Sequence, residues 1–110
     1  MTDPLWNDMA DAILDLEREL RGLGLWAQSP PDAELLASQQ PFCVDTLGFE
    51  QWLQWIFVPR MTAIIQQGRS LPGAFSIAPM GEEALAWMGR RRYTLVAILT
   101  RIDGLAARLA

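Results

Sequence analysis

The chain has 110 residues, a formal net charge of −4 and a hydrophobic content of 51%. It is long enough to bury one core but too short to bury a second, so we expect a single domain over residues 1–110. It contains no histidine and one cysteine, which excludes Ser-His-Asp triads, Cys-His pairs and His- or Cys-rich zinc sites. All of its basic residues are arginine. The net acidity makes the phosphate backbone of nucleic acid a poor default partner.

The sequence also predicts where the protein resides. The lone Cys43 cannot form an internal disulfide, which favours a reducing compartment, and we expect it to behave as a small apolar residue. The N-terminus is acidic, unlike a secretory signal, and no apolar run approaches the ~20 residues of a membrane span. We therefore expect a cytoplasmic protein with no membrane association.

An amphipathic pattern predicts a first helix from Pro4 to about Leu23. Thr2 or Asp3 can cap this helix, and Pro4 suits its first position, where the amide would be unpaired in any case. Apolar residues recur at helical spacing, which indicates one buried stripe: Leu5, Met9, Ile13, Leu16, Leu20 and Leu23. The glycines Gly22 and Gly24 supply the left-handed conformation that ends a helix.

A short second helix is predicted from Ser29 to about Ser38. Ser29 can cap it and Pro30 can occupy its first position. Pro41 ends it, because the residue before a proline is displaced from the helical region. The following residues 42–47 form a connection, in which Asp45 or Thr46 is the expected cap of the next helix.

The central helix is predicted over residues 49–67. Residues 51–61 are the most apolar stretch of the chain and hold two of its five tryptophans. The apolar residues cover more than one face, which is typical of a helix with neighbours on several sides: Phe49, Trp52, Leu53, Ile56, Val58, Met61, Ile64 and Ile65. We expect this helix to be the core element of a bundle.

Pro59 lies inside the central helix. It removes one backbone hydrogen bond and collides with the carbonyl of Trp55, at a cost of ~3 kcal/mol in a regular helix. The sequence therefore predicts a kink at this point. The alternative is a break with a restart at Pro59, because proline also suits a first helical position.

The C-terminal third contains two further helices. Gly68 ends the central helix, and Pro72-Gly73 has the signature of a type II turn, with positive φ at the glycine. The next helix starts at residues 76–79, with Leu85, Trp87 and Met88 on its apolar side, and ends at Gly89. The last helix runs over residues 93–109, and no segment alternates as a strand would. The fold class is thus all-α, a small bundle of four main helices and a short one around a Trp-rich, Pro-kinked central helix.

Short motifs with fixed spacings fill residues 40–80: Gln40-Pro41-Phe42, Asp45-Thr46, Trp52-Leu53-Gln54-Trp55, Pro59-Arg60-Met61, Leu71-Pro72-Gly73-Ala74-Phe75 and Ala78-Pro79. In these motifs the chain resembles the YqcC-like family of small bacterial proteins. It departs from that pattern at Met80, where relatives have tyrosine, and at Gly48-Phe49, where a proline can stand. The resemblance implies a small all-helical bundle and supplies no function, because the family is uncharacterised.

Members of that family are sometimes labelled by association with a tRNA pseudouridine synthase, and we do not interpret the label as an activity. Such synthases resemble one another in an Arg-Leu-Asp motif within a much larger mixed sheet. The run Arg101-Ile102-Asp103-Gly104 is only superficially similar, because it follows a helical pattern in a short chain. We interpret the match as chance.

One candidate ligand or partner pocket combines aromatic and polar side chains of the motif region, as small-ligand sites do: Phe42, Trp52, Trp55 and Phe75 with Asp45, Gln54 and Arg60. Aromatic residues at helical spacing are more often part of a core. Arg60 has a structural alternative as well, since its five donors can cross to Asp45 or to carbonyls freed at the kink. We prefer this structural interpretation and predict an Asp45–Arg60 pair.

A candidate nucleic-acid patch is the run Arg90, Arg91 and Arg92, followed by Tyr93. Arginines can contact phosphates and a nearby aromatic ring can stack on a base. Three charges between helices are more often simply solvated. The adjacent Glu82 and Glu83 point ~100° apart on a helix, so they are poorly placed to share a proton or a metal ion.

No residue set forms a recognisable nucleophile and base, so we expect no enzyme, no catalytic residue, no metal site and no cofactor. The preferred function is a non-catalytic cytoplasmic interaction module, with a protein partner or with itself. One alternative is an accessory protein of tRNA modification that acts through Arg90–Arg92. The other is a small-ligand binder at the aromatic pocket.

Overall fold

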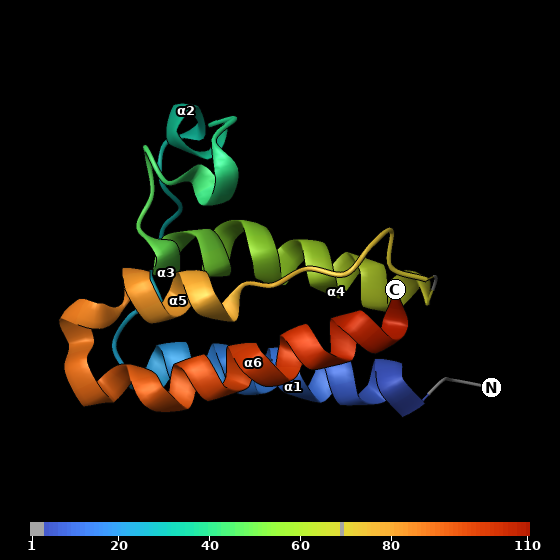
Figure 1. Cartoon of the computed structure of the whole chain (residues 1–110). Coiled ribbons are helices and arrows are strands. Elements are labelled where there is room, and N and C mark those ends of the chain that lie inside the picture. The colour runs from blue at the N-terminus through green and yellow to red at the C-terminus, as the bar shows by residue number, and fades with distance from the viewer. Residues whose placement is uncertain (1–3, 69) are drawn as a thin grey trace.

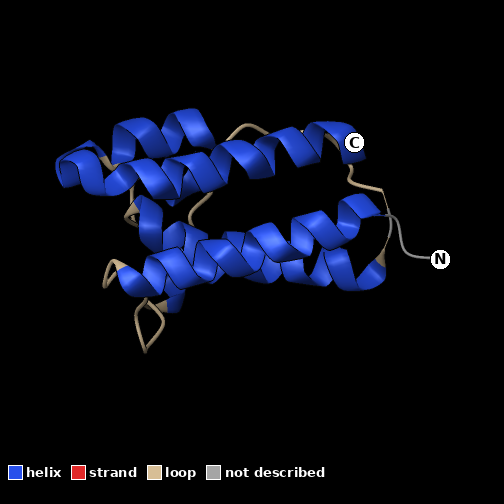
Figure 2. Ribbon diagram, turned by 90° about the horizontal axis from the view of Figure 1, so that it is seen from below, coloured by secondary structure: helices blue, strands red, loops and turns tan. Residues whose placement is uncertain are grey.

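Apolar residues at helical period fold most of the described chain into helices (Figure 2). The computed structural model describes residues 4–68 and 70–110, and within these ranges there is no strand. Its helices, of which η1 and η3 are 3₁₀ and η2 is a π-helix, are α1 Pro4–Gly22, α2 Ala33–Leu36, η1 Pro41–Cys43, α3 Phe49–Trp52, η2 Leu53–Phe57, α4 Val58–Gln67, α5 Ala78–Ala84, η3 Ala86–Arg92 and α6 Tyr93–Leu109. Because α3, η2 and α4 form one continuous helix, the predicted all-α bundle of four main helices and a short one is confirmed.

The bundle is organised around the contact between α1 and α6, which lie side by side and run in opposite directions (Figure 1). The helix α4 packs on α1, and α5 packs on α6. Nine large side chains at these contacts have less than 2% of their surface exposed: Met9, Leu16, Leu20, Leu53, Met61, Leu85, Leu95, Leu99 and Ile102. These residues come from α1, from the central helix, from α6 and, at Leu85, from the junction of α5 and η3, so these elements share one core.

The first helix ends as the glycines predict. Gly24 takes a positive φ of 75°, and the Leu25 N–H donates to the Leu20 carbonyl at 2.9 Å. The Gly24 N–H donates to Arg21, which completes the pair of bonds that closes many helix C-termini. The expected caps Thr2 and Asp3 lie outside the described residues.

Residues 25–48 project from the bundle and carry the short helix α2 (Figure 1). This helix spans only Ala33–Leu36, so the prediction of a helix over 29–38 is too long. The segment is fixed to the central helix by Gln54, which is 4% exposed. The Gln54 Oε1 accepts from the Ala27 N–H at 2.8 Å, and its Nε2 donates to the Ala27 carbonyl at 2.6 Å. The side-chain amide therefore satisfies both polar groups of one backbone residue.

The cap of the central helix differs from the prediction of Asp45 or Thr46. The N-cap is Gly48, and its N–H donates to the Gln51 Oε1 at 2.8 Å. Asp45 and Thr46 instead hold the projecting segment together: the Thr46 hydroxyl donates to the Leu35 carbonyl at 2.7 Å, and the Asp45 carboxylate accepts from the Ser38 hydroxyl. Both side chains are committed to contacts that precede the helix.

The distortion expected at Pro59 takes the form of a π turn. The Val58 N–H donates to the Leu53 carbonyl, five residues earlier, across the π-helix η2. The alternative of a break with a restart at Pro59 does not occur, because Phe57 and Val58 both keep helical dihedral angles. Widening the turn before proline is a known way for a helix to continue without the missing amide.

The expected type II turn at Pro72-Gly73 is wrong, because Gly73 is not among the glycines with positive φ. The chain instead reverses at Gly68, which ends α4 with a φ of 64°. Residues 71–77 then run beside the central helix toward α5 (Figure 1). They provide one wall of the cavity described next.

Candidate functional site

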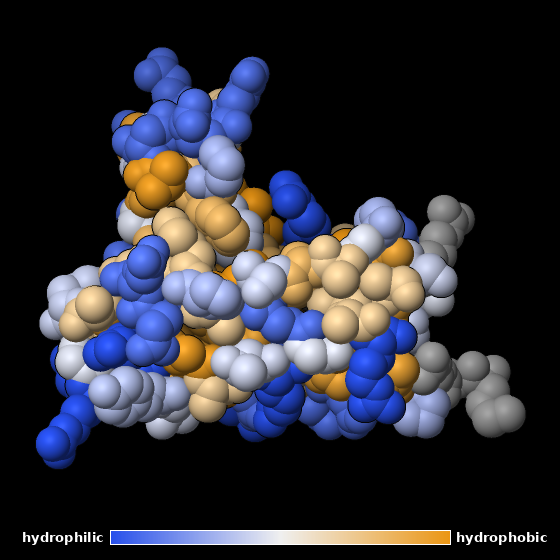
Figure 3. All heavy atoms as spheres, in the orientation of Figure 1, coloured by the Kyte–Doolittle hydropathy of each residue, from blue (hydrophilic) through white to orange (hydrophobic). Residues whose placement is uncertain are grey.

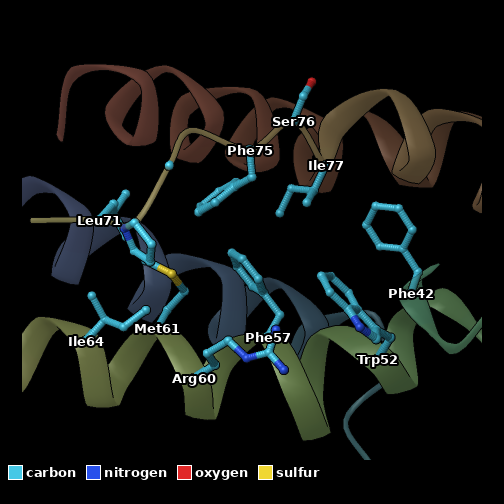
Figure 4. Close-up of a pocket in the computed structure, with 12 residues that line it drawn as sticks. Phe42, Trp52, Phe57, Arg60, Met61, Ile64, Leu71, Phe75, Ser76 and Ile77 are labelled. Atoms are coloured by element: carbon cyan, nitrogen blue, oxygen red, sulfur yellow. The ribbon is translucent and has the colours of Figure 1, made fainter. Parts of the chain in front are cut away.

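A cavity of about 290 Å³ lies between the central helix and the segment 71–77 (Figure 4). The helix supplies Trp52, Phe57, Arg60, Met61 and Ile64 to its lining, and the segment supplies Leu71, Pro72, Gly73, Phe75, Ser76 and Ile77. Phe42, from the projecting segment, completes it. Apolar side chains are also exposed at the base of that segment (Figure 3). The cavity is thus an apolar site bounded by three separate parts of the chain.

We call this cavity the aromatic groove. Four aromatic rings form a connected row through it: Phe42, Trp52, Phe57 and Phe75. The centroids of Phe42 and Trp52 are 4.8 Å apart in an edge-on arrangement, and those of Trp52 and Phe57 are 5.5 Å apart and stacked. The Phe57 and Phe75 rings meet edge-on at 5.6 Å. These spacings are those of favourable aromatic pairs, so the rings support one another in fixed positions.

The structure brings together four of the six residues predicted for the pocket, namely Phe42, Trp52, Arg60 and Phe75. Trp55 and Asp45 do not line the cavity. The buried Nε1 of Trp55 has no hydrogen-bond partner within the described chain. Gln54, also considered for the pocket, is committed to Ala27. The prediction from sequence missed Phe57. Phe57 follows Trp52 by five positions, and this spacing brings two side chains to the same face of a helix only where the helix contains a π turn.

The predicted pair between Asp45 and Arg60 is not present. Of the ion pairs within residues 4–68 and 70–110, none involves Arg60, and Asp45 accepts a hydrogen bond from Ser38. Arg60 is exposed at the edge of the cavity, where its side chain extends toward Phe57 (Figure 4). Its guanidinium therefore remains available to bind a group that is not part of the described chain.

The arginine run lies in η3, and two of its three side chains donate hydrogen bonds to other residues of the fold. The Arg92 side chain, 17% exposed, donates to the Gly89 carbonyl at 2.8 Å and to the Glu82 carboxylate at 3.1 Å. Arg91 donates to the Leu23 carbonyl at 3.2 Å. Arg90 is exposed and makes no hydrogen bond or ion pair to the described residues. The three arginines thus do not form an open set of phosphate ligands.

Two aromatic side chains beside that run are exposed. Trp87 has 65% of its surface exposed, although the sequence predicted it on the apolar side of a helix, and Tyr93 has 55% exposed. Even on a regular helix Trp87 points ~200° away from Leu85 and ~100° away from Met88, so it does not share their buried side. Gly89, with a φ of 58° and a ψ of −133°, interrupts η3 after Trp87. The Arg92 guanidinium lies 4.9 Å from the centre of the Tyr93 ring. We call Trp87, Arg90 and Tyr93 the η3 surface.

The run 101–104 has a structural role. Arg101 pairs with Asp15 of α1 at 2.7 Å. The Asp103 carboxylate accepts hydrogen bonds from the backbone of Ile77 and Ala78. Both side chains are therefore explained by contacts between helices, as expected for a chance match to a catalytic motif.

No group of three or more Cys, Asp or Glu side chains in the described part of the chain is arranged to hold a metal ion. Cys43 is buried. None of the described helices combines the length and the hydropathy needed to cross a bilayer.

Comparison with known proteins shows the family of this chain. Residues 8–105 match the family described as DUF446: tRNA pseudouridine synthase C. The uncharacterised protein YqcC of Escherichia coli K12 is 39% identical over 92 residues, which cover 84% of each chain. The chain belongs to the YqcC-like family. The solution NMR structure of E. coli YqcC covers 100% of this chain and 92% of that one, with a TM-score of 0.85 and 35% identity.

Two other relatives of this chain differ from each other in length. An uncharacterised protein of Haemophilus influenzae is 40% identical over 79 residues, 72% of this chain and 74% of that one. A protein of Pectobacterium carotovorum named tRNA pseudouridine synthase C is 35% identical over 86 residues, 78% of this chain but 22% of its own length. In that relative, the region similar to this chain is one part of a much longer protein.

Proposed function

We propose that the chain is a non-catalytic, cytoplasmic interaction module that binds a protein partner through the η3 surface. The observation that carries this proposal is the 65% exposure of Trp87, which is followed within six positions of the sequence by the exposed Arg90 and Tyr93. Tryptophan, tyrosine and arginine are the residues that dominate binding energy at protein interfaces. A tryptophan that contributes little to its own core is well suited to that role.

The contacts of the other two arginines favour a protein over a nucleic acid. Affinity for nucleic acid requires several cations free to neutralise phosphates. Arg91 and Arg92 donate to the carbonyls of Leu23 and Gly89, and Arg92 is also paired with Glu82. This leaves Arg90 as the one residue of the run without such a contact in the described structure.

The Pectobacterium relative supports an interaction role. There a region similar to this chain makes up 22% of a protein named tRNA pseudouridine synthase C. In our proposal the module acts beside a catalytic domain, and the partner of this chain is an enzyme of that kind.

A second candidate is an RNA accessory role at the same surface, favoured by the name of that relative. Arg90 would contact a phosphate, and Trp87 or Tyr93 would stack on a base. Such binding must weaken steeply with salt, because each neutralised phosphate releases a counterion. Salt dependence therefore separates the two candidates.

The test is affinity capture from the native cell with three forms of the protein, each with and without nuclease. We expect a protein that the wild type retains, that Trp87→Ser loses, and that nuclease leaves unaffected. Leu14→Ser is the matched control, because Leu14 is an apolar side chain with 51% exposure on α1. Equal retention by wild type and Trp87→Ser would contradict the proposal.

A tRNA titration completes the comparison. We expect the wild type to bind tRNA no more tightly than ~10⁻⁴ M at physiological salt, the weak end of non-specific affinity. A micromolar, salt-sensitive complex that Arg90→Ser weakens would favour the RNA accessory role instead.

A further inference from the structure

The aromatic groove combines an apolar interior with a single cation that the fold does not use. Its lining is almost wholly aromatic and aliphatic, and the polar side chains among its residues are those of Arg60 and Ser76. No hydrogen bond or ion pair within the described ranges involves the Arg60 guanidinium. In a protein of net charge −4, a cation left unpaired beside an apolar cavity points to an anionic ligand.

We propose that the groove binds a small arylalkyl carboxylate. The aromatic body would lie against Trp52, Phe57 and Phe75, whose rings already pair at 5.5 and 5.6 Å. The carboxylate would accept two hydrogen bonds from Arg60, because the planar guanidinium matches the two oxygens of a carboxylate. This site shares no residue with the η3 surface, so the inference is independent of the proposed protein partner.

The size of the cavity restricts the ligand. A volume of about 290 Å³ is at the lower end for ligand pockets, and at ~30 Å³ for each water-sized group it holds about ten non-hydrogen atoms. One ring with a short acidic side chain has that size. A longer chain or a second ring system would extend into solvent.

The charge of the ligand follows from the alternatives. An amine would meet the Arg60 cation without a carboxylate of the lining to pair with it. A neutral alcohol would fill the same space but would leave the guanidinium with solvent. Only an anion gains from both parts of the site, because a charge-assisted hydrogen bond is about twice as strong as a neutral one.

The test is a titration of the full chain with 3-phenylpropionate, 3-phenylpropanol and 3-phenylpropylamine, followed by ¹H–¹⁵N NMR. We expect the acid to bind at least about tenfold more tightly than the alcohol, and the amine to bind less tightly than either. Shift changes should concentrate in residues 52–64 and 71–77. Arg60→Gln should lower the affinity for the acid to that of the alcohol.

Arg108→Gln is the matched control, because Arg108 is another exposed arginine but lies in the last turn of α6. It removes the same charge and should leave the preference for the acid unchanged. Equal affinities for acid and alcohol, or an acid preference that survives Arg60→Gln, would overturn the proposal. So would the absence of any shift change in the groove at roughly 10 mM acid, a concentration at which a ligand of this size should bind measurably.

Discussion

The Asp103 carboxylate accepts a hydrogen bond from the Ala78 N–H at 2.8 Å. It also accepts from the Ile77 N–H at 2.9 Å. An N-cap side chain normally provides such an acceptor, but Ile77 at the N-cap of α5 has no side-chain oxygen. A residue from α6 therefore caps α5, and the two helices depend on each other.

We expect Asp103→Ala to lower the free energy of unfolding by about 1–3 kcal/mol, because two amides lose a charged acceptor. Urea denaturation followed by circular dichroism measures the change. The control is Asp8→Ala, which removes an exposed carboxylate of α1 and should change stability by less than about 0.5 kcal/mol. Equal effects of the two replacements would show that the cap adds nothing.

Replacement of Gln54 tests the attachment of the projecting segment. We expect Gln54→Leu to cost about 1–3 kcal/mol, because both polar groups of Ala27 lose their partner. Amide exchange at Ala27 should accelerate in the variant. Gln67→Leu, at the exposed end of α4, is the control and should leave that exchange rate unchanged. Unaltered exchange at Ala27 in Gln54→Leu would contradict the attachment.

Pro59→Ala tests what holds the π turn in place. Leu53 and Phe57, at the two ends of η2, are 0% and 5% exposed, so we expect their burial to retain the turn without proline. The free energy of unfolding should then change by no more than about 1 kcal/mol in either direction. A loss of several kcal/mol in denaturation would show that the backbone depends on proline itself.

Double-mutant cycles test the partners of Asp45. Because the structure pairs Asp45 with Ser38 and not with Arg60, the cycle of Asp45→Asn with Arg60→Gln should give a coupling energy below about 0.5 kcal/mol. The cycle of Asp45→Ala with Ser38→Ala, which removes both partners, should give a larger one, although exposure limits it to about 1 kcal/mol. Coupling of 1 kcal/mol or more between Asp45 and Arg60 would restore the prediction from sequence.

Single replacements of Arg92 and Arg90 distinguish an arginine with structural contacts from an exposed one. Arg92→Ser should destabilise the fold by about 1–2 kcal/mol, since the side chain bridges Gly89 and Glu82. Arg90→Ser should have no measurable effect on the unfolding transition. Replacement of all three arginines, which the sequence suggests is harmless, is therefore expected to weaken the fold. Identical melting temperatures for the two single variants would contradict this distinction.

Helical periodicity was sufficient to predict the main helices and most of the core, because burial of an apolar stripe is encoded in spacing. It could not reveal partners that are distant in sequence. Asp103 and Ala78 are on different helices, as are Arg101 and Asp15. Nothing local distinguishes these side chains from solvated ones.

The residues of the candidate site were likewise predictable from sequence only in part. Four residues of the motif region, Phe42, Trp52, Arg60 and Phe75, line one cavity. Trp87 was misplaced because it was assigned to the apolar side with Leu85, although two residues apart on a helix differ by ~200° in direction. Arg60 was assigned an internal partner, although pairing depends on geometry that charge alone does not specify.

The π turn also determines where the central helix can lose one residue without exposing its buried side chains. Phe49 and Met61, at 5% and 2% exposure, are both buried although they are twelve positions apart. At ~100° per residue, eleven positions complete about three turns, so the π turn absorbs one extra residue within the helix. Deleting one residue from η2 would convert it to a regular helix and leave both flanks facing the core. Elsewhere in the central helix, the same deletion would rotate one flank by ~100° and expose its buried side chains.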